Sequence, residues 1–189
     1  MKKFMNVKLL MVLFACFTLF CSCSKIKEAA TTDITVSGEM YVELKDIPVV
    51  TGTTRGEVSN HFSVENAVIK LEDFNLSEEI LKYRNNIESV RVGSETSIVV
   101  TTTDKEGTVV EKFVFKASSI RYVIEVDRYE LGTTYTNPNL LSFAEASLEQ
   151  LFKTGELKIS TSGNTDITSG ETLNVRLTIK NIVLKASAI

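Results

Sequence analysis

The sequence has no tryptophan, a single histidine, and three cysteines that all lie within its first 23 residues. Without cysteine in the rest of the chain, no disulfide framework can form there. One histidine and no free thiol also leave too few ligands for a zinc or copper site. Because sugar-binding modules stack sugar rings on exposed aromatic side chains, a carbohydrate platform here would depend on three tyrosines, Tyr41, Tyr129 and Tyr135.

Basic residues are also in deficit, with 21 Lys and Arg against 24 Asp and Glu and a formal net charge of −3. Three of the basic residues are Lys2, Lys3 and Lys8, so the remainder of the chain is more acidic than the whole. Binding to nucleic acid or to anionic lipid head groups requires a positive surface. We therefore expect no nucleic-acid partner.

The first 22 residues combine this basic start with a short apolar run, Leu9–Phe20, a pattern typical of export signals. A helix of that length reaches roughly 18 Å, whereas the hydrocarbon core of a bilayer is about 30 Å thick. The pattern therefore predicts a signal peptide over residues 1–22 rather than a transmembrane helix.

Ser22 and Cys23 end this run, and they resemble the lipobox of bacterial lipoproteins, where a small residue precedes an invariant acylated cysteine. Phe20 and Cys21 depart from the family's usual letters. A rival box ends at Cys16, but it would shorten the apolar run to seven residues. The resemblance implies lipidation of Cys23, with Cys16 as the alternative.

The resemblance further implies that acyl chains on Cys23 anchor the protein to a bacterial membrane, since each buried CH₂ contributes about 0.8 kcal/mol. Residues 23–33 would then form a polar tether, and residues 34–189 one domain. In this family an Asp after the cysteine often signals inner-membrane retention, and here that position is Ser24. The implied location is the outer membrane or the cell surface. The layout resembles a broad group of uncharacterised bacterial surface lipoproteins with a single sandwich domain.

In most of residues 34–189, apolar and polar side chains alternate, which is typical of half-buried strands. The predicted strands are Ile34–Leu44, Phe62–Leu71, Val90–Thr102, Val109–Ala117, Ile120–Val126, Leu157–Thr161 and Leu173–Ala186. A phase change predicts a bulge near Asn66. Asp46–Asn60 and Leu131–Asn139 contain Pro and Gly and are predicted to be loops. Asp104–Gly107 is predicted to be a hairpin turn.

Two short helices are predicted where Asn75 and Ser142 each precede a Glu by three residues, the spacing of a capping box. The first covers Leu76–Asn86, and the second ends at Gly155. About seven alternating strands with two connecting helices predict an all-β fold, an antiparallel β-sandwich, with a small β-barrel as the alternative.

Candidate catalytic and metal-binding residues are few. His61 has Ser59, Ser63 and Glu65 nearby in sequence, but no Gly-x-Ser-x-Gly motif accompanies them. Asn164–Asp166 approaches a calcium loop without its spaced acidic residues, so turn formation is the better interpretation.

Two carboxylate pairs have the residue types needed for glycoside hydrolysis. These are Glu125 with Asp127, predicted on the solvated face of a strand, and Glu72 with Asp73. Acidic residues are common in this chain, so neither pair predicts a catalytic site.

The sequence therefore predicts a non-enzymatic, lipid-anchored module of the cell envelope, without a cofactor. Its predicted loops at 46–60 and 131–139 would bind a protein or glycan partner. One alternative is an envelope enzyme whose site is assembled from dispersed residues. Another is an apolar-ligand carrier, which requires a cavity lined by Phe113, Phe115, Ile124 and Val126.

Overall fold

The computed structural model describes residues 31–54, 57–74, 76–102 and 108–187. The predicted leader, Cys23, most of the predicted tether, Asn75 and the predicted turn Asp104–Gly107 lie outside these residues. The strands are β1 (Thr31–Thr35), β2 (Met40–Thr54), β3 (Glu57–Lys70), β4 (Ile87–Arg91), β5 (Ser97–Thr102), β6 (Val109–Ala117), β7 (Val123–Glu130), β8 (Glu156–Thr165), β9 (Thr172–Ile179) and β10 (Val183–Ser187). The helices are η1 (Leu71–Asp73), α2 (Glu78–Lys82), η2 (Arg84–Asn86) and α3 (Pro138–Thr154).

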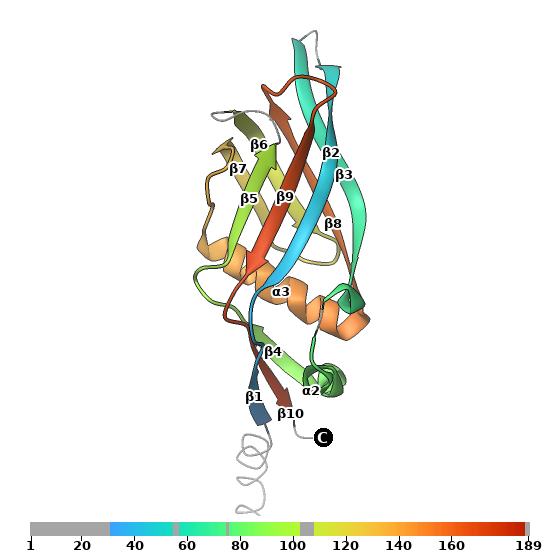
Figure 1. Cartoon of the computed structure of the whole chain (residues 1–189), viewed down its shortest axis with the longest axis vertical. Helices are drawn as coiled ribbons and strands as arrows, with labels where there is room; N and C mark the ends of the chain where they lie inside the picture. Colours follow the sequence, from blue (N-terminus) through green and yellow to red (C-terminus); the bar gives the residue numbers. More distant parts are fainter. Residues whose placement is uncertain (1–30, 55–56, 75, 103–107, 188–189) are drawn as a thin grey trace, which may run out of the picture.

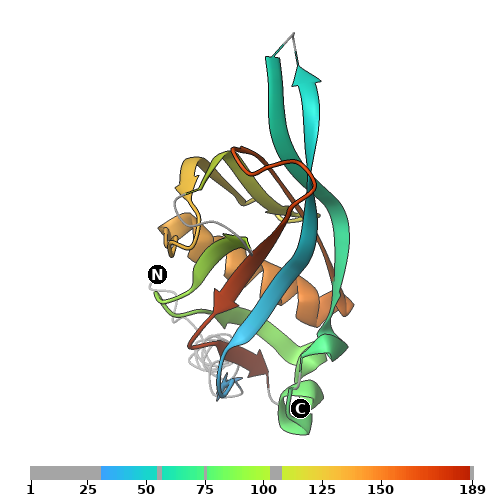
Figure 2. The ribbon, with the colours of Figure 1, turned by 45° about the horizontal axis from the view of Figure 1, so that its top comes forward.

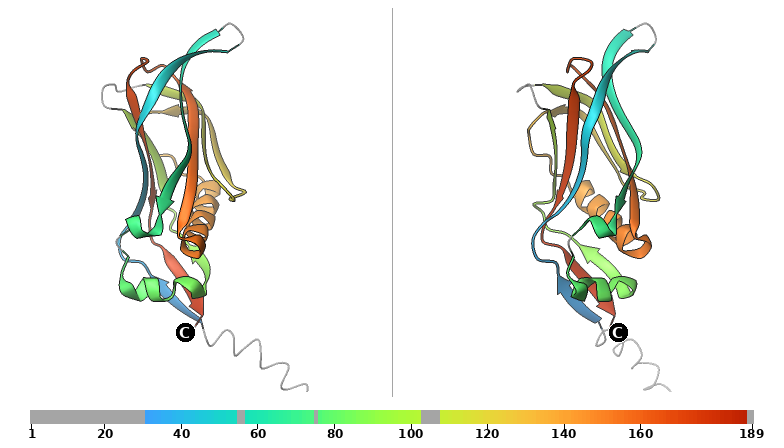
Figure 3. Two further views of the ribbon diagram at one scale, coloured as in Figure 1. Left: turned by 90° about the vertical axis from the view of Figure 1, so that its right-hand side faces the viewer. Right: turned by 45° about the vertical axis from the view of Figure 1, so that its right-hand side comes forward.

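All strand pairs are antiparallel, and they form a seven-stranded sheet in the order β5-β9-β2-β3-β8-β6-β7 and a three-stranded sheet in the order β1-β10-β4. The predicted fold class, an all-β antiparallel sandwich, is confirmed. The larger sheet curls into a half-barrel (Figure 3). The first part of β2 pairs with β9 and the last part with β3, so this strand belongs to both halves of the curl.

Three predicted strands each run through both sheets. Val90–Thr102 divides into β4 and β5, Leu173–Ala186 into β9 and β10, and Ile34–Leu44 into β1 and the start of β2. The order β4-β10-β1 in the smaller sheet repeats the order β5-β9-β2 in the larger one. The smaller sheet therefore continues three strands of the larger sheet beyond a bend. Residues Thr31–Asp33 of the predicted tether form the first part of β1.

The bend coincides with residues of positive φ, Gly38 at 89° and Asn181 at 51°. Gly93, in the connection between β4 and β5, donates a backbone hydrogen bond of 2.7 Å to the carbonyl of Lys180 in the connection between β9 and β10. Glycine and asparagine tolerate positive φ better than other residues, so they occur where the strands change direction.

The prediction of a loop at Asp46–Asn60 is wrong, because these residues continue β2 and β3 into a long hairpin with register Val49↔Phe62 to Thr54↔Glu57. Pro48 and Gly52 resemble loop signals, but the cross-strand ladder keeps both residues extended. Asp46, with φ of 52°, forms the irregularity in the β2–β9 ladder, and its amide donates to the Asn174 side chain at 2.9 Å. The described end of this hairpin, residues 50–54 and 57–60, projects beyond the body (Figure 2), and we call it the arm.

The bulge predicted near Asn66 is confirmed by its φ of 55° and by the register shift between Val64 and Ala67. The Asn66 amide, displaced from the ladder, donates to the Ser160 hydroxyl at 3.0 Å. A buried or half-buried amide that leaves a ladder needs such a substitute acceptor.

The predicted loop Leu131–Asn139 is partly extended, because part of it pairs with β5. This pairing closes the open side of the curled sheet. The Gly132 amide donates to Val100 of β5 at 2.9 Å, and Tyr135 exchanges two backbone hydrogen bonds of 3.0 Å with Ile98. The segment after β7 thus joins the two outer strands of the larger sheet, although they are not direct neighbours.

Both helices begin at other residues than predicted. The N-cap of α3 is Asn137 rather than the predicted Ser142, and its side chain accepts a hydrogen bond from the Asn139 backbone amide. The helix begins earlier than predicted because Pro138 suits the first helical turn. The helix ends at Gly155 as predicted, with φ of 84°. The N-cap of α2 is Ser77, which accepts a hydrogen bond from the Ile80 amide.

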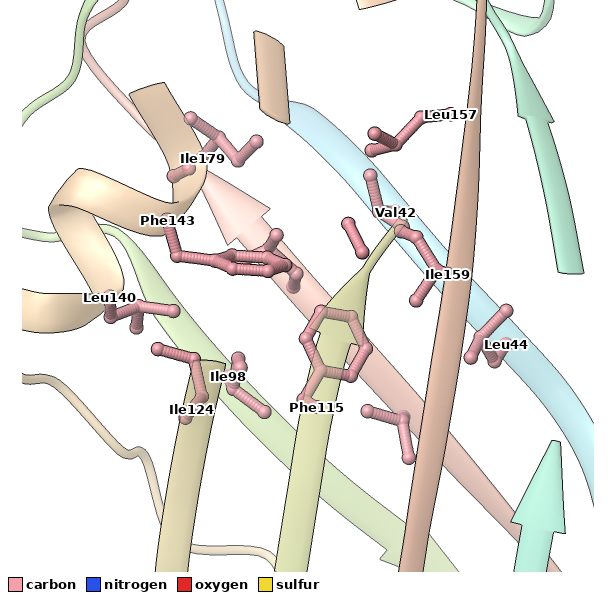
Figure 4. Packing of buried hydrophobic residues seen from close by; sticks show 14 of the residues in the cluster. Val42, Leu44, Ile98, Phe115, Ile124, Leu140, Phe143, Leu157, Ile159 and Ile179 are labelled. Atoms are coloured by element: carbon pink, nitrogen blue, oxygen red, sulfur yellow. The ribbon is translucent and has the colours of Figure 1, made fainter. Parts of the chain in front are cut away.

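The buried face of α3 packs between the sheets, in contact with β4, β7 and β8. Figure 4 shows how Leu140 and Phe143 of this helix meet Phe115, Ile124 and Ile98 from the larger sheet. All five side chains are at most 2% exposed. One hydrophobic core therefore joins the helix to the concave side of the curl.

The outer edge of β4 is covered by two side chains of α3. The Val90 and Val92 amides donate to the carboxylates of Glu149 and Glu145, both at 3.3 Å. An edge strand exposes unpaired amides that can pair with another chain, and covering them prevents this.

Candidate functional site

The arm lies at the opposite end of the molecule from the first described strand. In Figure 1 β1 is at the bottom and the end of the β2–β3 hairpin is at the top. A tether joined to β1 would therefore leave the arm pointing away from the surface to which the tether is attached.

Apart from Asn60, which pairs with Thr165 of β8, the outer strand edges of the arm are unpaired in the described part of the chain. The β2–β9 ladder ends at Pro48, and the β3–β8 ladder begins at Asn60, so Thr51–Thr54 pairs only with Glu57–Asn60. Two large apolar side chains are exposed nearby, Val50 at 44% and Val58 at 70%. Free backbone edges beside exposed valines are the features by which an extended protein segment adds to a sheet.

A cleft of about 1180 Å³ lies at the base of the arm, between it and the ends of three other strands. It is lined by Val58, Ser59, Asn60, Val109, Glu111, Lys112, Arg128, Asn164, Thr165 and Asp166. The lining carries both signs of charge. One of its polar groups is already engaged, since the Asn60 side-chain nitrogen donates to the Ile167 carbonyl at 2.7 Å.

The prediction of a turn at Asn164–Asp166 is wrong for its first two residues, because Asn164 and Thr165 pair with β3 and β6 as the end of β8. All three residues line this cleft and tie β8 to β6. The Asp166 carboxylate accepts from the Val109 amide at 3.0 Å, and the Thr165 hydroxyl donates to the Val109 carbonyl at 3.2 Å. Their side chains thus stabilise the sheet. Over the described residues, no three His, Cys, Asp or Glu side chains gather in a way that would hold a metal ion.

His61 lies at the base of the arm, paired with Val50 of β2 and Asn164 of β8. Its imidazole covers Gly52, and a Cβ atom at Gly52 would overlap it. Ser59 and Ser63 lie two residues before and two residues after it on the same strand, and in the described part of the chain no hydrogen bond joins them to His61. The arrangement packs the imidazole against the hairpin and does not pair a nucleophile with a base.

The two carboxylate pairs lie on the surface. Glu125 and Asp127 are exposed on β7. Glu72 forms an ion pair with Lys70 at 3.4 Å, and the Asp73 carboxylate accepts from the Lys70 amide at 2.9 Å. The second pair therefore holds the start of η1, and neither pair faces the other across a cleft.

The three tyrosines do not form a platform. Tyr129 is buried, and its hydroxyl accepts from the Val100 amide and donates to the Thr133 carbonyl. Tyr135 packs against the core beside β5. Tyr129 faces inward because the alternation of burial along β7 changes phase between Val126 and Tyr129. This change lies opposite Lys112 of β6, whose φ is 52°. Tyr41 alone of the three is exposed, at 50%.

The cavity required by a carrier is filled by side chains. Phe113 and Phe115 stack at 6.5 Å between ring centroids, and Phe143 meets Phe115 edge to face at 5.5 Å. Phe113 also contacts Tyr129 at 5.9 Å. These rings belong to the packed core, so the structure offers no support for an apolar ligand at this place.

Among the described residues, none of the helices has the length and apolarity to cross a bilayer. No protein-family model matches the chain, and no curated protein matches it significantly. A solved structure described as decameric BFDV capsid protein is 11% identical, with a TM-score of 0.38, covering 82% of this chain and 98% of that one. Another, described as desmodium yellow mottle tymovirus, is 6% identical, with a TM-score of 0.28 and coverage of 84% of both chains. TM-scores this low carry no argument about function.

Proposed function

We propose that the protein is a lipid-anchored, non-catalytic binding module of a bacterial cell envelope, held in the membrane by acyl chains on Cys23. The arm meets a protein partner, because its unpaired edges and exposed valines suit the addition of a strand. The observation that carries the proposal is the placement of the arm and of β1 at opposite ends of the molecule. The candidate catalytic side chains support it as well, since each takes part in packing, capping or solvent contact.

Replacing Cys23 by alanine is expected to remove the lipid and to release the protein from the membrane fraction, because the acyl chains supply the anchoring free energy. Mass spectrometry of the detergent-extracted native protein should find a fatty-acylated N-terminal Cys23. Cys16→Ala is the matched control and should leave both acylation and fractionation unchanged. A native protein that keeps Met1, or that carries no lipid, would refute the anchor.

A photo-crosslinking residue at Val58, introduced in intact cells, is expected to trap a protein partner in a discrete adduct. The same residue at Val68, which is 47% exposed but lies on the body of β3, is the matched control and should give no such adduct. Equal crosslinking at both positions, or none at Val58, would argue against the arm as the partner-binding element.

A further inference from the structure

A second cleft, of about 780 Å³, lies near the other end of the molecule, between the β1–β2 segment and the η1–α2 segment. Its volume falls within the range of about 300–1,000 Å³ that small-ligand sites occupy. The lining residues are Thr32, Asp33, Ile34, Thr35, Val36, Ser37, Glu39, Met40, Tyr41, Asp73, Phe74, Leu76, Ser77, Ile80 and Tyr83. We call it the Tyr41 cleft.

The ring of Tyr41 is held in place on two sides. Its hydroxyl donates to Glu39 at 2.5 Å, and the guanidinium of Arg176 lies 5.5 Å from the ring centroid. Arg176 is itself fixed by Glu43, with nitrogen–oxygen distances of 3.0 and 2.7 Å. An exposed aromatic ring that is already ordered loses little conformational entropy when a ligand stacks on it.

The contacts of Glu39 and Tyr41 also fix the protonation states of these two side chains at neutral pH. The hydrogen bond from Lys180, 2.6 Å away, and then that from Tyr41, hold the pKa of Glu39 below its ordinary value. The hydrogen bond to Glu39 in turn raises the pKa of the Tyr41 hydroxyl. The carboxylate therefore stays ionised and the phenol stays protonated.

The remaining lining restricts the ligand's chemistry. Hydroxyls and carboxylates of the lining lie beside buried and half-buried apolar groups, and none of the lining residues is Lys, Arg or His. Phosphate, sulfate and uronate groups need cationic partners. The two cations beside the cleft, Lys180 and Arg176, are already paired with Glu39 and Glu43, so the cleft disfavours anionic ligands. A molecule with many hydroxyls and apolar C–H faces but no charge meets both kinds of lining group.

We propose that the Tyr41 cleft binds a neutral oligosaccharide, with one pyranose ring stacked against Tyr41 and its hydroxyls bonded to carboxylates and hydroxyls of the lining. The C–H face of a pyranose packs on an aromatic ring, and carboxylates accept from sugar hydroxyls with good geometry. This site is separate from the arm and does not depend on where the protein is anchored.

The test measures binding of the detergent-extracted full protein to neutral hexasaccharides of glucose, mannose, galactose, xylose and N-acetylglucosamine, first on an array and then by calorimetry. At least one should bind, and Tyr41→Ala should weaken it about tenfold, because the variant loses the stacking contact of one ring. Tyr41→Phe keeps the ring and should stay within about threefold of the wild type.

Tyr122→Ala is the matched control. Tyr122 also has an arginine over its ring, Arg121 at 4.8 Å, and a hydrogen bond from it at 2.7 Å, but it does not line the cleft. It should leave affinity unchanged, whereas Asp33→Asn inside the cleft should lower it.

A hexamer of galacturonate, as an anionic probe, should bind at least about tenfold more weakly than the preferred neutral sugar. Failure of every neutral sugar to bind, or equal binding by wild type and Tyr41→Ala, overturns the proposal. Either result leaves acylation of Cys23 and crosslinking at Val58 untouched.

Discussion

Replacing Phe115 by alanine is expected to reduce the free energy of unfolding by about 3–5 kcal/mol, as truncation of a fully buried aromatic side chain usually does. The side chain is fully buried and contacts the rings of Phe113 and Phe143. Its loss removes apolar burial and leaves a cavity that β6 and α3 cannot close without moving toward each other. A change of this size is a large fraction of the stability of a typical domain, about 5–15 kcal/mol.

Urea unfolding of the wild type and the variant measures this difference, provided that both transitions have the same slope. Val68→Ala is the matched control, because that valine is 47% exposed on β3, and its truncation should change stability by less than about 0.5 kcal/mol. Equal midpoints for wild type and Phe115→Ala would show that this ring is not in the core.

Gly163→Val is expected to destabilise the fold by about 1–3 kcal/mol through overpacking. Gly163 is a buried residue of β8, opposite Phe62. A Cβ atom there would lie 2.8 Å from a methyl carbon of Val110 and 3.0 Å from two ring carbons of Phe62. Since Phe62 is itself 1% exposed, the ring has no free space into which it can move.

Thermal unfolding followed by circular dichroism would detect this change as a lower midpoint. Ser162→Val serves as its control, because successive side chains of a strand point to opposite faces, and Ser162 is only half-buried. The control should shift stability by less than about 1 kcal/mol. If both valines had the same effect, the close approach to Phe62 would not be the cause.

The features predicted correctly from the sequence are those that local periodicity determines. Alternating burial identifies the strands and the fold class, the phase change locates the bulge at Asn66, and Gly155 marks the end of α3. Each of these depends on residues close together in the chain, so the sequence pattern contains the necessary information.

The arm and the sheet boundaries were not predictable in this way. Pro48 and Gly52 carry the composition of a loop, and only pairing with β3 and β9 keeps them extended. Similarly, the alternation continues through Gly93 in the predicted strand Val90–Thr102, and nothing local shows that its two halves belong to different sheets. Tertiary pairing outweighs local propensity at these places.

The Tyr41 cleft shows the same limit for a site. The sequence identifies Tyr41 as a candidate aromatic, but Arg176 and Lys180 reach it only through the register of β2 with β9. Opposite charges at positions 43 and 176 would be a usable signal once that register is known, because cross-strand ion pairs are common on exposed sheet faces.

The continuity of β1 with β2 has a mechanical consequence. A pull on the chain before Thr31 passes through β1 directly into β2, which lies between β9 and β3 in the larger sheet. Interstrand hydrogen bonds run perpendicular to the strands, so a load along β2 strains the whole ladder at once instead of opening it bond by bond. A body held from this end therefore resists tension through the ladders that β2 forms with β9 and β3.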